Sequence, residues 1–140
     1  GWEPTPEQIV YQLPVNVAET DATAFAEVQA ALDHGVVTGG LVAANRLVTS
    51  AGFFGAGDEK LKHRFRDLAA DEPRSVEAAV DRGTILCGGP DTVARQVKRL
   101  RHEIGCGVLN LIFDRGGPPH SKLRSIELFA RHVMPQVRDL

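Results

Sequence analysis

The segment that decides the fold is Thr84-Ile-Leu-Cys-Gly-Gly-Pro-Asp-Thr-Val93, together with the later stretch Val108-Leu-Asn-Leu-Ile-Phe113. Each contains a short, nearly unbroken apolar run, which is typical of strands buried on both faces. A helical pattern follows each run after a turn rich in glycine and proline. Strand–helix alternation with short turns favours right-handed crossovers and a parallel sheet. We therefore predict that the chain ends like the last two units of a β/α barrel.

The two helices in this region have clear start and stop signals. Pro90 suits the first helical turn, where the acidic Asp91 also complements the helix dipole, and Gly105 suits the end. The predicted buried stripe of this helix is Val93, Val97, Leu100 and Ile104. For the closing helix, which has Pro135 near its end, the predicted stripe is Leu123, Ile126, Ala130 and Val133.

An earlier strand–helix unit precedes this region. Leu13-Pro-Val-Asn-Val-Ala18 alternates apolar and polar residues and predicts a strand. Pro14 has no N–H, so we place it at a sheet edge or at the first residue of the strand. A helix capped by Thr20 or Asp21 should follow, with Phe25, Val28 and Leu32 on one face.

Residues 34–82 form a variable helical or loop excursion between the first strand and the second. Residues 34–57 lack a clean period, whereas a helix is predicted to begin at Asp58, with Leu61, Phe65 and Leu68 at helical spacing. A further helix is predicted from Pro73 to Gly83, with Val76, Ala79 and Val80 facing inward. The whole chain, residues 1–140, then reads as one α/β domain: a partial TIM-type (β/α) barrel made of the last three β/α units with parallel strands.

Bulk properties narrow the function classes. The chain has 140 residues, fewer than the ~250 of a complete eightfold barrel. Sixteen basic and eighteen acidic side chains give a net charge of -2, which favours neither nucleic acid nor membranes as partners. The sequence shows neither a signal peptide nor an apolar run long enough to span a bilayer. We therefore expect a cytoplasmic protein.

Cysteines and histidines give little indication of a metal or redox centre. We expect Cys87 and Cys106 to be reduced and buried, with a disulfide as the less favoured alternative. Four histidines lack ligand-like spacing to one another or to a cysteine, so no metal site is predicted. They are His34, His63, His102 and His132. A basic cluster (Arg95, Lys98, Arg99 and Arg101) alternates with an apolar stripe and is expected to be a solvated helix face.

Two turns are candidate binding sites. At Gly88-Gly89-Pro90, glycines let a ligand approach the backbone, and the following helix N-terminus offers N–H groups to an anion. The alternative is that Gly88 and Gly89 only make a tight turn. After the last strand, Arg115 could bind a phosphate or carboxylate and His120 could donate a hydrogen bond or move a proton. Alternatively, His120 caps the closing helix and Arg115 is solvated.

Several motifs resemble one family. The segments Cys87-Gly-Gly-Pro-Asp-Thr-Val93, Glu103-Ile-Gly-Cys-Gly-Val-Leu-Asn-Leu111, Pro119-His120 and Ile126-Glu-Leu-Phe-Ala-Arg-His-Val-Met-Pro135 resemble the C-terminal end of the bacterial luciferase-like monooxygenases. Val15-Asn-Val-Ala-Glu-Thr-Asp-Ala22 resembles an upstream strand–helix entry of the same family.

This resemblance implies an oxidoreductase with a β/α barrel, reduced flavin mononucleotide (FMN) or a deazaflavin, oxygen, and a small organic substrate. Within such an enzyme, we expect this chain to contribute Gly88 and Gly89 near an anionic group of the cofactor and Arg115 and His120 at the substrate mouth; no catalytic residue is assigned. The chain departs from the family where Gly89 replaces a serine and in the loop before Pro119. Much of the family's flavin contact comes from earlier strands, so we expect the isolated chain to be inactive.

Two other functions remain open: a non-catalytic half-barrel that serves binding or assembly, and a small α/β domain that binds a phosphorylated ligand at Gly88-Gly89-Pro90. Three consecutive barrel units would leave two sheet edges unpaired, one at the strand near Leu13 and one at Val108-Leu-Asn-Leu-Ile-Phe113. We therefore expect either a homo-oligomer or a missing N-terminal barrel half.

Overall fold

The protein is built on a small parallel sheet. The computed structural model describes residues 3, 5–33, 75–113 and 120–140. Its three strands are β1 (Val10–Val17), β2 (Leu86–Gly88) and β3 (Val108–Ile112), and both pairings are parallel. The α/β class with parallel strands is therefore confirmed.

The order of the strands differs from a simple barrel wall. Hydrogen bonds place the strands in the order β2-β1-β3, so β1 lies in the middle. The prediction that the strand near Leu13 forms an edge is therefore wrong, whereas β3 does lie at an edge of this sheet. Right-handed crossovers permit this order. If the connecting helix covers one face of the sheet, the next strand lies on one side of the previous strand, and if it covers the other face, the next strand lies on the other side. Sequence periodicity does not distinguish these choices.

Pro14 lies inside β1, which corrects its predicted position at an edge or strand start. Val10 to Pro14 pair with β3, and Val15 to Val17 pair with β2. Pro14 thus stands where the pairing passes from one neighbour to the other. A residue without an N–H fits this point, because the pairing with β3 ends at Pro14 and the pairing with β2 begins only at Val15.

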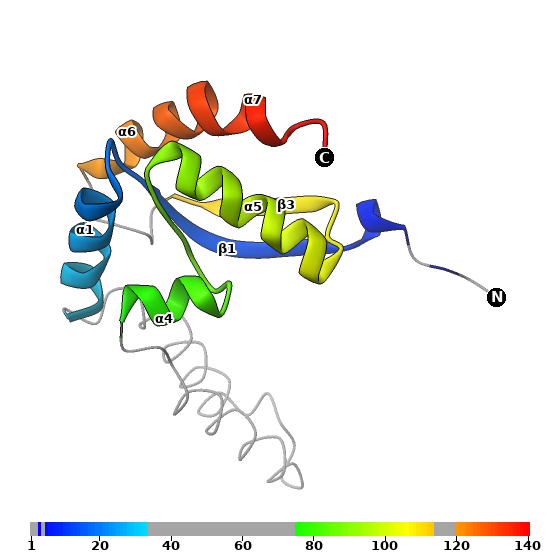
Figure 1. Ribbon diagram of the computed structural model, residues 1–140, viewed down its shortest axis with the longest axis horizontal. Helices are drawn as coiled ribbons and strands as arrows, with labels where there is room; N and C mark the ends of the chain where they lie inside the picture. Colours follow the sequence, from blue (N-terminus) through cyan, green and yellow to red (C-terminus); the bar gives the residue numbers. More distant parts are fainter. Residues whose placement is uncertain (1–2, 4, 34–74, 114–119) are drawn as a thin grey trace, which may run out of the picture.

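The helices largely match their sequence signals (Figure 1). Helix α5 begins at Pro90 and is ended by Gly105 with φ 72°, as predicted. The predicted helix from Asp58 and the predicted start at Pro73 lie outside the described residues. The helical segments are η1 (Pro6–Gln8), α1 (Asp21–Asp33), α4 (Val76–Asp81), α5 (Pro90–Ile104), α6 (Ser121–Leu128), η2 (Phe129–Val133) and α7 (Met134–Val137).

Apolar side chains pack against both faces of the sheet. Adjacent residues of a strand point to opposite faces, and Leu86 and Cys87 accordingly belong to different core clusters. The cluster around Leu86 includes side chains of α5 and η2, whereas the cluster around Cys87 includes side chains of α1 and α4. The helices that follow β1 and β2 therefore cover opposite faces.

Burial of β3 and of the C-terminal helix corrects two predictions. Val108 is 41% exposed and its partner Val10 is 60% exposed, so β3 is not buried on both faces. Leu123 and Ile126 are exposed at 78% and 38%, so the predicted stripe of the closing helix is wrong apart from Val133. The buried positions of this helical segment are instead Ser121, Ser125, Phe129 and Val133.

The closing helix contains a π-helical segment, η2, between α6 and α7. Met134 donates its N–H to the carbonyl of Phe129, five residues earlier. Pro135 explains the change, because it has no N–H for the carbonyl of Arg131 and would clash with it in a regular α-helix. The wider turn shifts which residues face the sheet.

Both cysteines are free and buried. Burial raises the pKa of the Cys87 thiol to about 12, with the negative charges of Asp21, Glu27 and Glu77 acting in the same direction. In the part of the chain that the structure describes, every helix is too short or too polar to cross a membrane.

Candidate functional site

Polar side chains gather at the carboxyl edge of the sheet. The three strands are parallel, so their carboxyl ends meet at one edge. After β1 the chain enters α1, whose buried residues belong to the cluster around Cys87. After β3 it enters α6 and then η2, and Phe129 of η2 belongs to the cluster on the opposite face of the sheet. In open α/β sheets, ligands bind in the crevice where neighbouring connections diverge to opposite faces.

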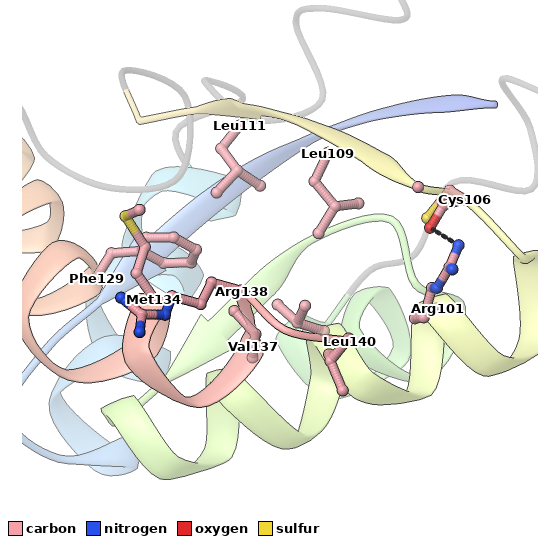
Figure 2. A pocket seen from close by; sticks show the side chains of 11 residues that line it. Arg101, Cys106, Leu109, Leu111, Phe129, Met134, Val137, Arg138 and Leu140 are labelled. Atoms are coloured by element: carbon pink, nitrogen blue, oxygen red, sulfur yellow. Dashed lines mark hydrogen bonds between the residues drawn. The ribbon is translucent and has the colours of Figure 1, made fainter. Parts of the chain in front are cut away.

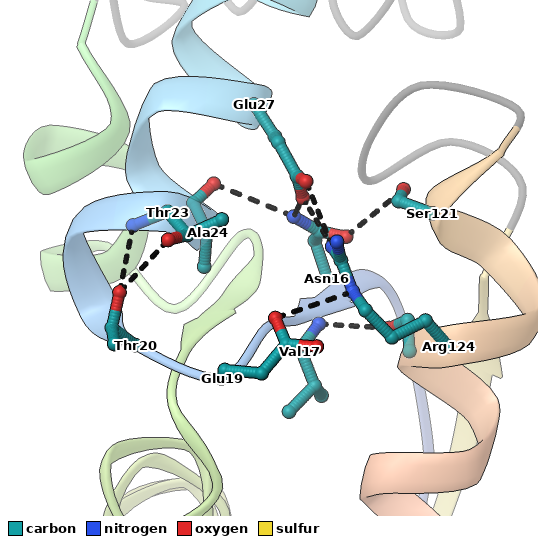
Figure 3. A network of polar contacts seen from close by, with 10 residues as sticks. Asn16, Val17, Glu19, Thr20, Thr23, Ala24, Glu27, Ser121 and Arg124 are labelled. Carbon is teal, nitrogen blue, oxygen red and sulfur yellow. Dashed lines mark hydrogen bonds and ion pairs between the residues drawn. The ribbon is translucent and has the colours of Figure 1, made fainter.

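Asn16 is the buried centre of this edge (Figure 3). It is only 1% exposed although it lies in an otherwise apolar part of β1. Its Nδ2 donates to Glu27 Oε2 at 2.9 Å and to the carbonyl of Ala24 at 3.4 Å, and its Oδ1 accepts from Ser121 Oγ at 3.4 Å. Asn16 therefore ties β1 to both α1 and α6.

Glu27 and Arg124 join α1 to α6 across the edge. Arg124 Nη2 donates to Glu27 Oε1 at 2.8 Å and to Oε2 at 2.7 Å. The carboxylate of Glu19 lies 3.8 Å from Arg124 Nε but is 62% exposed. That Nε is buried and has no hydrogen-bond partner among the described residues. Arg124 thus keeps one buried donor that the described residues do not satisfy.

The Glu27 carboxyl is held in its charged form. Burial raises its pKa, but hydrogen bonds from Arg124 and Asn16 lower it by more, and the charges of Arg124 and His120 act in the same direction. The net result is a pKa below the ordinary value of 4.5. At neutral pH, Glu27 is therefore an ionised partner of Arg124 rather than a proton donor.

The glycine turn before α5 holds an anion supplied by the protein itself. Asp21 Oδ1 accepts from the Gly89 N–H at 2.6 Å, and its Oδ2 accepts from Thr92 Oγ1 at 2.9 Å. Gly88 has φ 144°, and a Cβ there would lie 2.8 Å from Asp21 Oδ1. The glycines therefore admit the Asp21 carboxylate to the turn. A ligand phosphate that used the Gly89 N–H would have to exchange with it.

The structure brings some of the sequence-predicted site residues to this edge. Gly88 and Gly89 lie at the end of β2, and exposed His120 occupies the N-cap position of α6 without a side-chain capping bond. Arg115 lies outside the described residues. Whether Gly88, Gly89, Arg115 and His120 contact a ligand stays a prediction.

Sequence reasoning missed the central members of the edge, Asn16, Glu27 and Arg124. Glu27 and Arg124 are separated by 97 positions in the chain, so no local pattern links them. One signal was available: Asn16 is a polar residue between two valines in the apolar half of a strand. A buried amide of this kind needs partners from neighbouring elements.

The described residues offer binding groups rather than nucleophiles or metal ligands. Across residues 5–33, 75–113 and 120–140, no cluster of three or more His, Cys, Asp or Glu side chains could hold a metal ion. The Cys87 thiol, with its raised pKa, is protonated at neutral pH and is not an activated nucleophile. The chemistry that the edge can provide is recognition of an anionic or hydrogen-bonding group.

Comparison with known proteins gives structural but not sequence-level relatives. No protein-family profile matches the chain. No curated protein matches it either.

Two solved structures share the fold. The monooxygenase RslO1 from Streptomyces bottropensis superposes with a TM-score of 0.53 and 24% identity over 96% of this chain and 32% of its own. The oxygenating constituent of 3,6-diketocamphane monooxygenase from Pseudomonas putida, a type II Baeyer–Villiger monooxygenase in complex with FMN, gives a TM-score of 0.56 and 21% identity over 98% and 35%. The chain thus has the fold of about one third of these two monooxygenases.

Proposed function

We propose that this chain is the C-terminal portion of a luciferase-like, flavin-dependent monooxygenase that oxidises a small organic substrate with oxygen and reduced FMN. The observation that carries this proposal is the fold shared with two monooxygenases over nearly the whole chain, one of them bound to FMN. The motifs from Cys87 to Pro135 that resemble the luciferase-like family support the same conclusion independently of the fold.

The carboxyl edge fits an anionic part of such a cofactor. Arg124 has a buried Nε without a hydrogen-bond partner among the described residues, and the side chain of His120 is close enough to lower the pKa of Glu27. A phosphate can replace the exposed Glu19 carboxylate near Arg124. We propose that Arg124 binds the phosphate, with Gly88 and Gly89 as backbone neighbours.

The flavin, when bound, would supply the activation of oxygen, and the protein would position and shield it. The part of this task that we assign to the chain is to bind the anionic end and, through His120 and Arg115, to line the substrate mouth. We expect no turnover by the purified 140-residue chain, even with a flavin reductase present, because it spans only a third of the monooxygenases that it resembles.

Calorimetric titration with FMN and with riboflavin tests the proposal, because the two ligands differ only in the phosphate. We expect FMN to bind at least about tenfold more tightly than riboflavin, since a charge-assisted hydrogen bond contributes ~1.5–3 kcal/mol. Arg124→Gln should abolish this difference. Glu27→Gln, which breaks the same ion pair but leaves the guanidinium free, should preserve it. Arg131→Gln is the matched control, since Arg131 pairs with Glu127 at the surface.

The outcomes separate the competing functions. Equal affinity for FMN and riboflavin in the wild type, or absence of binding by both, would contradict the cofactor proposal. Binding of inorganic phosphate or adenosine monophosphate as tightly as FMN would favour a general phosphate-binding α/β domain. Failure to bind any of these ligands would favour the non-catalytic assembly module.

A further inference from the structure

A cavity of about 300 Å³ lies away from the carboxyl edge. Figure 2 shows the side chains that line it. The cavity extends between β3, the C-terminal part of α5 and the η2–α7 segment, and reaches Cys106 and Gly107, which precede β3. It therefore extends as far as the amino end of that strand. Its apolar lining is Val97, Leu109, Leu111, Phe129, Met134, Val137 and Leu140. Small-molecule sites are typically apolar hollows of about 300–1,000 Å³ with a few polar groups, so this cavity suits a small ligand.

The π-helical segment helps to shape the cavity. Phe129 and Met134, the two residues joined by the i→i+5 hydrogen bond, both line it. Pro135 prevents the segment from relaxing to a regular α-helix, because it offers no N–H to the carbonyl of Arg131. Phe129 is further held by an edge-to-face contact with Phe113, with ring centroids 5.8 Å apart. The Phe113–Phe129 contact and Pro135 thus hold this wall of the cavity in place. Single-turn π segments are frequent at functional sites.

The charged side chains that line the cavity, those of Arg101 and Arg138, are both cationic. Arg101 Nη1 donates to the carbonyls of Cys106 at 3.0 Å and Gly105 at 3.3 Å, which fixes its partly buried guanidinium beside the cavity while its other nitrogens keep donors. Arg138 also lines the cavity but is 71% exposed, and it is only weakly paired with Asp139 at 3.5 Å. None of the lining side chains is acidic.

From this arrangement we propose that the cavity binds a small monocarboxylic acid with an apolar body, whose carboxylate pairs with Arg101 and whose hydrocarbon part lies against Leu109, Leu111 and Val137. Apolar walls favour burial of the hydrocarbon part, and the guanidinium selects an acid over a neutral analogue. This inference does not depend on the flavin proposal, because the two sites share no residue.

Titration of the ¹⁵N- and methyl-labelled 140-residue chain with octanoate tests the proposal by NMR. We expect saturable one-to-one binding, with the largest shifts at Leu109, Leu111 and Val137. Octanol, which lacks the charge, should bind about tenfold more weakly, as expected for the loss of one charge-assisted hydrogen bond. Absence of saturable octanoate binding, or equal affinity for octanol, would overturn the proposal.

Two variants locate the site. Val137→Trp fills the cavity and should weaken octanoate binding at least tenfold. Leu123→Trp is the matched control: it adds the same ring to the same helical run at a position that is 78% exposed and outside the cavity, and it should bind octanoate like the wild type. Unchanged octanoate affinity in a folded Val137→Trp variant would place the ligand elsewhere and refute the assignment. The comparison of octanoate with octanol needs no variant, so it decides the question even if Val137→Trp does not fold.

Discussion

Glu27→Gln isolates the contribution of the carboxyl-edge ion pair to stability. The Glu27 side chain is 15% exposed and that of Arg124 is 28% exposed, so the pair is neither fully buried nor a surface pair. Exposed pairs contribute ~0.2–1 kcal/mol, whereas breaking a fully buried pair costs ~3–5 kcal/mol. With two short contacts to Arg124 and one to Asn16, we expect an intermediate loss of about 2 kcal/mol. For a chain of this size that corresponds to a fall in Tm of roughly 6 °C.

Urea unfolding followed by circular dichroism measures this loss, and Glu127→Gln provides the matched control. Glu127 pairs with Arg131 at 2.8 Å, but their side chains are 55% and 71% exposed, so this substitution should cost less than about 0.5 kcal/mol. A loss for Glu27→Gln no larger than that for Glu127→Gln would refute the reasoning.

The pH dependence of the same comparison supplies a second check. The pKa of Glu27 is lowered in the folded protein from its ordinary 4.5. The stabilisation that the Glu27 charge provides is therefore fully present above the pKa of Glu27 in the unfolded chain. It is lost as the pH falls through the lower pKa of Glu27 in the folded protein. The stability difference between wild type and Glu27→Gln should stay constant from pH 7 down to about 4.5 and then narrow. A difference that does not change with acidification would show that the glutamine disturbs packing rather than charge.

Three further predictions concern other parts of the chain. Gly88→Ala should destabilise by about 2–4 kcal/mol in urea unfolding, because its Cβ would meet Asp21 at 2.8 Å. Gly105→Ala, where φ is 72° but no atom lies within 4 Å, should cost only ~1–2 kcal/mol, and equal losses would contradict the steric argument. The Cys87 thiol, whose pKa is raised to about 12, should resist iodoacetamide at pH 8 in the native state and react after unfolding. Intact-mass spectrometry measures this labelling, and rapid labelling of the native protein would show that the buried site opens. Light scattering at micromolar concentration should give an oligomer, because β3 pairs on one side only within the described residues; a clean monomer of 15.1 kDa would refute this.

Elements with strong local signals were predictable from the sequence. The α5 helix carries its own start at Pro90 and its own end at Gly105, and the structure confirms both. Of its predicted apolar stripe, Val93, Val97 and Leu100 are buried, whereas Ile104 in the last turn is 37% exposed, which corrects that part of the prediction. The apolar run beginning at Val108 likewise forms a strand. These features depend on residues within one or two turns of each other, so they are visible in one sequence.

Features that depend on distant contacts were not predictable. The sheet order β2-β1-β3 follows from pairing between segments far apart in the chain, and periodicity is the same for either order. The face of the closing helix was misjudged because a polar residue, Ser125, is buried there by accepting a hydrogen bond from the Val17 N–H at 2.8 Å. Asp21 enters the glycine turn from 68 positions away in the chain, so no local pattern shows that the Gly89 N–H already has a carboxylate partner.

The candidate site was only partly visible for the same reason. Gly88, Gly89 and His120 were found because turns after predicted strands share one edge of a parallel sheet. Arg124 was not found, because its importance comes from one buried donor atom without a partner among the described residues. Such an atom is a property of packing rather than of composition.

Mapping of FMN onto the ¹⁵N-labelled chain by NMR tests the central claim most directly. If the chain contributes to a flavin site, FMN should shift the backbone resonances of Gly89, His120, Ser121 and Arg124 at the carboxyl edge, and riboflavin should shift them much less. Resonances of the separate cavity, such as Leu109, should not move. Shifts confined to the cavity, or absence of shifts at the carboxyl edge at millimolar FMN, would contradict the assignment of this edge to a flavin monooxygenase.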